Sequence, residues 1–69
     1  MEMRITFDKD ADAVYIYFKE ISSGEVKQTI SLNDSVNVDL GEDGKTLGIE
    51  ILDASKNMPL ETLNSALII

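Results

Sequence analysis

Apolar and polar residues alternate along most of this chain, which is the pattern of β-strands that bury one face. Five segments carry this signal: residues 3–7, 13–18, 26–32, 36–40 and 47–51. The last segment is the most apolar of them, with Leu47, Ile49 and Ile51 on one side and Gly48 and Glu50 on the other. We therefore expect residues 47–51 to be the strand that its neighbours need as a partner.

Short polar turns separate these segments, so each connection is short enough for an antiparallel meander. In the first hairpin we expect the apolar residues to pair: Phe7 with Val14, Ile5 with Ile16, and Met3 with Phe18. The same register places Thr6 beside Tyr15, and Arg4 beside Tyr17 on the opposite face. There the guanidinium of Arg4 can lie over a phenol ring.

After residue 55 the period changes to that of a helix. Pro59 is suited to a first helical turn, with Asn57 as a cap, and Leu60, Leu63 and Leu67 then fall on one face. We expect an α+β fold: an antiparallel β-meander of about five strands with one short C-terminal helix packed on one face. Residues 1–69 are expected to form a single domain.

Composition restricts the function classes. The chain has 69 residues, no Cys, and a net charge of −7 from six basic and 13 acidic residues. The basic residues are scattered singly, which argues against nucleic-acid binding. No apolar run approaches the ~20 residues of a membrane span. We expect a cytoplasmic protein without a membrane partner. A homo-oligomer, with a dimer favoured, would bury more apolar surface than so small a domain buries alone.

Catalytic chemistry finds little support, because the chain has neither His nor Cys. The commonest general base and the best nucleophile are therefore absent, and we expect no enzyme, no catalytic residues, no metal site and no cofactor. Asp8, Asp10 and Asp12 alternate like the start of a calcium loop, but the glycine and glutamate that such a loop needs are missing. They are interpreted as an acidic turn, with a weak cation site as the alternative.

Two further carboxylates, Asp39 and Glu50, are expected near each other on the sheet face away from Val38 and Ile49. Paired carboxylates run hydrolytic or metal chemistry when a cleft holds them. An open sheet has no such cleft, so we interpret them as solvated residues of the polar face, and the neighbouring Asp53 as a helix cap.

The best candidate for an interaction surface is the second face of the sheet, with Arg4, Tyr15, Tyr17 and Glu50. Tyr and Arg are enriched at protein interfaces. There are two alternatives for these side chains: ordinary cross-strand packing on an outward face, or a platform for a small ligand. The apolar segment Leu67, Ile68 and Ile69 is costly to leave in water, and we expect it to dock on this or a neighbouring subunit.

Three stretches carry a resemblance: Asp8 to Ile16, the D-L-G-E-D-G-K of residues 39–45, and the L-G-I-E-I-L-D-A-S of residues 47–55. Together they resemble the domain of unknown function 2283 family of small prokaryotic proteins, over about residues 4–56. The resemblance implies a single β-rich domain in a prokaryotic cytoplasm and implies no activity. The residues favour a non-catalytic protein-interaction or self-assembling module. A small-ligand or divalent-cation-binding protein is the alternative.

Overall fold

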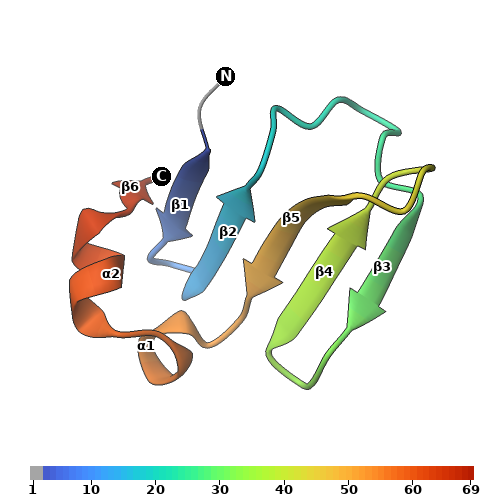
Figure 1. Ribbon diagram of the computed structural model, residues 1–69. Helices are drawn as coiled ribbons and strands as arrows, with labels where there is room; N and C mark the ends of the chain where they lie inside the picture. Colours follow the sequence, from blue (N-terminus) through green and yellow to red (C-terminus); the bar gives the residue numbers. More distant parts are fainter. Residues whose placement is uncertain (1–2) are drawn as a thin grey trace.

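The central element is a six-stranded sheet in which strand β5 lies between β4 and β2. The computed structural model describes residues 3–69, which form a flat arrangement of 33 × 28 × 18 Å (Figure 1). The elements are, in order, β1 (Arg4–Asp8), β2 (Ala13–Tyr17), β3 (Gln28–Ser31), β4 (Val36–Leu40), β5 (Thr46–Ile51), α1 (Ala54–Asn57), α2 (Leu60–Ser65) and β6 (Leu67–Ile68). All five predicted strands are present within two residues of their expected ends.

The first hairpin has the expected register. Phe7 pairs with Val14, Ile5 with Ile16, Thr6 with Tyr15, and Arg4 with Tyr17. The pair expected between Met3 and Phe18 is not part of the ladder, because both residues lie outside the strands. Both are exposed.

The predicted meander is wrong in its strand order, which is β3-β4-β5-β2-β1-β6. The connection from β2 to β3 crosses one end of the sheet, and β5 takes the place beside β2 (Figure 1). Sequential strands need not be neighbours when a connection of ten residues separates them. The interior place suits β5, because Leu47 on it is buried and Ile49 and Ile51 gain a strand on each side.

The single C-terminal helix is also wrong, because the segment breaks into α1, α2 and the short strand β6. Met58 is extended (φ −129°, ψ 148°) since a residue before proline avoids helical backbone, and this separates α1 from α2. Asn57 therefore ends α1 and does not cap α2. Ala66 is extended as well, so Leu67 leaves the helical face and enters β6.

Strand β6 makes the sheet mixed, because it runs parallel to β1, with Leu67 opposite Thr6 and Ile68 opposite Phe7. The N–H of Ile69 donates to the carbonyl of Phe7 at 3.0 Å. The segment therefore pairs with its own chain through the backbone, while the side chains of Leu67, Ile68 and Ile69 stay exposed. Among residues 3–69 no helix is long and apolar enough to cross a bilayer.

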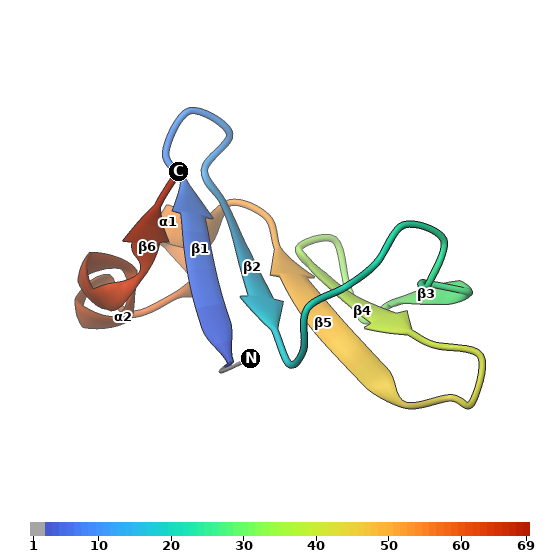
Figure 2. The ribbon, with the colours of Figure 1, turned by 90° about the horizontal axis from the view of Figure 1, so that it is seen from above.

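The core lies between the helices and one face of the sheet. Val14, Ala54 and Leu63 are its buried residues, and Met58 packs against them. The strands contribute the partly buried side chains of Ile5, Phe7, Ile16 and Ile51. Leu60, expected beside Leu63, is 71% exposed. The helices gather at the β1–β6 end of the sheet, with β3 at the other end (Figure 2).

Candidate functional site

Four residues singled out in the sequence share one face of the sheet, which we name the tyrosine face: Arg4, Tyr15, Tyr17 and Glu50. The Arg4 guanidinium lies 4.5 Å from the centroid of the Tyr17 ring. The centroids of Tyr15 and Tyr17 are 4.6 Å apart, with their planes tilted by 51°. Glu50 is opposite Tyr15 and accepts a hydrogen bond of 3.2 Å from the Asn37 amide. The structure therefore brings these four side chains together.

Tyr15 makes the side-chain hydrogen bond with the largest sequence separation on this face. Its hydroxyl donates to Asp39 Oδ2 at 2.5 Å, and the hydroxyl of Thr29 donates to Asp39 Oδ1 at 2.6 Å. Asp39 is opposite Gly48 and Glu50 is opposite Asn37, so the two carboxylates are diagonal neighbours on this face. Both oxygens of Asp39 thus accept bonds that connect β2, β4 and β3.

Gly48 makes this contact possible. A Cβ added to Gly48 would lie 2.4 Å from the Tyr15 hydroxyl oxygen and from its Cε1. The phenol ring therefore occupies the space that any other side chain at position 48 would need. A glycine inside a strand often marks such a close approach, and this is the sequence signal from which the contact was predictable.

Burial, followed by the hydrogen bond to Asp39, raises the pKa of Tyr15 well above its ordinary value of 10. A low-polarity surrounding disfavours the phenolate, and a donated hydrogen bond stabilises the neutral phenol. Tyr15 is consequently a neutral hydrogen-bond donor throughout the physiological pH range. These contacts are those of a cross-strand structural residue.

The apolar segment Leu67, Ile68 and Ile69 lies at the β6 edge, beside the tyrosine face. Leu67 is opposite Thr6, which is opposite Tyr15, so Leu67 extends the same row of side chains. Its side chain is 56% exposed even though its backbone is paired. Of the predicted interface residues, Arg4, Tyr15, Tyr17, Glu50 and Leu67 thus share one face across β1, β2, β5 and β6, whereas Ile68 is opposite Phe7 and lies on the other face.

The aspartates of the first turn hold the local backbone. Asp8 Oδ1 accepts the N–H groups of Asp10 and Ala11. Asp12 accepts the N–H of Ser55 at 3.0 Å and the hydroxyl of Ser55 at 2.7 Å. Asp12 therefore caps α1 across the fold. Within residues 3–69 no three His, Cys, Asp or Glu side chains gather as a metal-sized group.

Asp53, the cap expected from the sequence, occupies the N-cap position of α1 without a side-chain hydrogen bond. Its backbone is left-handed (φ 48°), and its carbonyl accepts the N–H groups of Lys56 and Asn57. The capping side chain comes instead from Asp12, 43 residues from Ser55. Sequence proximity could not reveal this partner.

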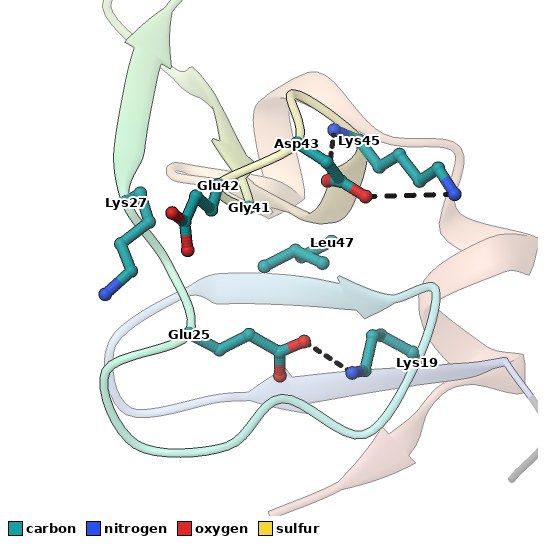
Figure 3. A pocket seen from close by; sticks show the side chains of 8 residues that line it. All are labelled: Lys19, Glu25, Lys27, Gly41, Glu42, Asp43, Lys45 and Leu47. Atoms are coloured by element: carbon teal, nitrogen blue, oxygen red, sulfur yellow. Dashed lines mark hydrogen bonds and ion pairs between the residues drawn. The ribbon is translucent and has the colours of Figure 1, made fainter.

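A hollow of about 570 Å³ lies between the β2–β3 connection and the β4–β5 hairpin (Figure 3). This volume is in the range of small-molecule sites. The hollow was not predicted, because its residues come from segments that only the fold brings together. It is lined by Lys19, Glu25, Lys27, Gly41, Glu42, Asp43, Lys45 and Leu47.

Four of the six charged residues that line the hollow form two ion pairs. Lys19 donates to Glu25, and Lys45 lies 3.7 Å from Asp43 (Figure 3). The hydrogen bond from Lys19, followed by that from the Ser22 N–H, lowers the pKa of Glu25. A carboxyl general acid needs the opposite shift, toward a raised pKa. The hollow therefore offers ion-pairing groups around an apolar floor.

The second feature that the sequence did not reveal is how little of the apolar face the helices cover. One row crosses the sheet through Ile5, Ile16, Ile49, Val38 and Ile30. A second row runs through Ile68, Phe7, Val14, Ile51 and Val36, and Leu32 extends it by donating its N–H to the Val36 carbonyl.

The contacts of these rows with the core end at β5. At the β3 end Ile30 is 41% exposed and Leu32 is 65% exposed. We name the side chains of Ile30, Leu32, Val36 and Val38 the open apolar patch.

Comparison with known proteins agrees with the resemblance noted in the sequence. No curated protein and no solved structure gives a significant match. A family model does match, over residues 4–55, and its description is "Protein of unknown function (DUF2283)". That range includes β1 to β5 and the start of α1. Since the match extends over most of the chain, this protein belongs to the DUF2283 family.

Proposed function

We propose that this protein is a non-catalytic module for protein–protein interaction or self-assembly. The observation that carries the proposal is the open apolar patch, which continues the core rows beyond the part that the helices cover. In water such a continuous apolar surface is unfavourable, and its burial against a partner stabilises the complex by roughly 25 cal/mol per Å² of apolar area, before the costs of association.

The small core supports the same function. Four hydrophobic side chains among residues 3–69 are buried: Val14, Leu47, Ala54 and Leu63. Several large hydrophobic side chains are exposed at the same time, at both ends of the sheet. A domain of this size buries about 60% of the surface that its unfolded chain exposes, less than a larger domain does, and a partner that covers apolar residues adds stability.

The test is a capture experiment with tagged protein, offered both an untagged copy of itself and a native cell lysate. Three proteins are compared: wild type, Leu32→Lys in the open apolar patch, and Leu60→Lys on α2. Leu60 is as exposed as Leu32, and it lies on α2 at the other end of the sheet. It therefore controls for the introduced charge.

We expect wild type and Leu60→Lys to retain a polypeptide that Leu32→Lys loses, with all three folded by circular dichroism. Retention of nothing by the wild type, or of the same polypeptides by all three proteins, would refute the proposal. A fourth protein, with Tyr15 and Tyr17 both replaced by alanine, tests the prediction that the tyrosine face is an interface in the same assay.

A further inference from the structure

We propose that the partner at the open apolar patch is a second copy of this chain, joined by antiparallel pairing of β3 with β3 around Ile30. This inference rests on the proposed function and names its partner. The dimer is a continuous sheet of two copies related by a twofold axis at Ile30, so each copy uses the same surface. The apolar rows of one copy then continue into those of the other.

The edge of β3 is open for such pairing. β3 is the outermost strand, and all four of its residues are exposed. No described segment of the chain lies beyond it (Figure 1). Sheet edges are usually protected by Lys, Pro or an inward charge. The sequence of β3, Gln28-Thr29-Ile30-Ser31, has none of these.

The backbone N–H and C=O groups of β3 point to the open edge at two residues. Leu32 donates its N–H to the Val36 carbonyl, so Leu32 and Ile30 form hydrogen-bonded pairs with β4. The bonding direction alternates along an antiparallel strand. Thr29 and Ser31 therefore present their N–H and C=O groups to the open edge, where they match those of a second β3.

The face pattern limits the register. A twofold axis normal to the sheet keeps the apolar faces of both copies on the same side. Residues directly opposite each other point to the same side of a sheet, so the axis must lie midway between the two copies of one residue, which is then opposite itself. With the axis at Ile30, Thr29 of each copy bonds to Ser31 of the other, and both outward residues are used. The two Ile30 side chains then meet as a non-hydrogen-bonded pair, the closer kind of cross-strand pair.

Charge also favours a second copy at this edge, despite the net charge of −7. β3 carries no charge, Lys27 precedes it, and Asp34 follows it in the turn to β4. In an antiparallel pair, Lys27 of each copy lies near the end of the other copy's β3, where Asp34 follows. This opposite-charge arrangement occurs at both ends of the contact. The contact is thus neutral at its centre and attractive at its ends.

The experiment is a disulfide scan, which is clean because the natural chain contains no cysteine. Single cysteines are placed at Thr29, Ile30 and Ser31, with Leu60→Cys as a control far from this edge. At an axis through Ile30 the two Cα atoms of residue 30 are about 4.5 Å apart, within the disulfide range. The two copies of residue 29, or of residue 31, are diagonal neighbours about 7–8 Å apart.

We expect Ile30→Cys to give at least tenfold more disulfide dimer than the other three variants in a glutathione buffer, by non-reducing electrophoresis. The cysteine-free protein should be a dimer by light scattering. Ser31→Pro should be a folded monomer, because it removes an outward N–H and leaves the bonds to β4. Dominant cross-linking at residue 29, 31 or 60 would overturn the proposed contact, as would a dimeric Ser31→Pro protein.

Failure of this contact is distinguishable from failure of the proposed function. A cysteine-free dimer that Ile30→Cys does not trap would overturn the β3 contact and leave self-assembly standing. A monomer that still captures another protein through Leu32 would overturn the second copy as partner and leave the interaction module standing. A monomer that captures nothing would overturn both.

Discussion

The phenol ring of Tyr15 lies over Gly48 and reaches across it to hydrogen-bond Asp39 at 2.5 Å. Strand β5 provides the space for this ring, and strand β4 provides the acceptor. One side chain on β2 therefore connects three strands on the face that the helices do not cover. A side chain at position 48 and the present position of the ring are mutually exclusive.

Gly48→Ala is expected to lower the free energy of unfolding by about 1–3 kcal/mol, because the new methyl group displaces the Tyr15 ring. Urea denaturation measures this effect. Gly41→Ala is the control, since its Cβ would be in ordinary contact, 3.5 Å from the Leu47 methyl groups. In a Tyr15→Ala protein the Gly48→Ala change should cost much less, and an equal cost in both backgrounds would contradict the clash.

The pH dependence of Tyr15 follows from its raised pKa. Because the folded value lies above the unfolded value of 10, its contribution to stability is fully present below pH 10. That contribution is lost as the pH rises through the folded value. In a Tyr17→Phe protein, where Tyr15 is the single tyrosine, phenolate absorbance should give a midpoint well above 10.

The same titration tests the causes of the shift. Asp39→Asn should lower the midpoint only in part, because burial is the largest cause and remains. Unfolding in urea should return the midpoint to about 10. A midpoint near 10 in the folded Tyr17→Phe protein would show that the Tyr15 hydroxyl is neither buried nor bonded.

The cap that Asp12 provides to α1 is expected to be worth about 1 kcal/mol. Asp12→Gly removes the carboxylate and still permits the left-handed backbone at this position (φ 51°). Asp10→Gly is the matched control, because it makes the same change in the same turn. Thermal denaturation should show a clearly larger loss for Asp12→Gly, and equal losses would indicate that the bonds to Ser55 contribute nothing.

Leu63 and Leu60 test which side of α2 faces the core. Leu63 is 5% exposed and packs with Val14, whereas Leu60 is 71% exposed. Leu63→Ala should cost about 2–5 kcal/mol, which is a large share of the stability of a small domain. Leu60→Ala should stay within about 0.5 kcal/mol in the same denaturation experiment. Similar costs for the two would contradict the helix orientation.

Calcium is expected to leave the melting temperature unchanged. The Asp8 carboxylate already accepts the N–H groups of Asp10 and Ala11, and the Asp12 carboxylate accepts two bonds from Ser55. A cation that binds the native state selectively must raise the midpoint, so melts with calcium and with a chelator decide the matter. A calcium-dependent rise that Asp10→Gly abolishes would favour the cation-binding alternative.

The local pattern determined the strands, the first hairpin and the grouping of Arg4 with Tyr17. Alternation with a period of two depends on each residue's own side chain and on neighbours a few positions away. The pairing of Phe7 with Val14 follows from a turn of four residues, which leaves few registers open. These features needed no information from distant parts of the chain.

The tertiary structure decided the strand order, the break of the helix and the surfaces that stay open. β5 displaced β3 from the place beside β2 because a ten-residue connection permits either neighbour, and burial of Leu47 favours the interior place. Leu67 was expected on the helical face but lies in β6, where its backbone pairs opposite Thr6 of β1. The fold brings together Asp12 with Ser55 and Tyr15 with Asp39, which are 43 and 24 residues apart in the sequence. Alternation identifies which side of a strand is apolar. How much of that side is buried depends on where the helices pack against the sheet, which the local pattern does not determine.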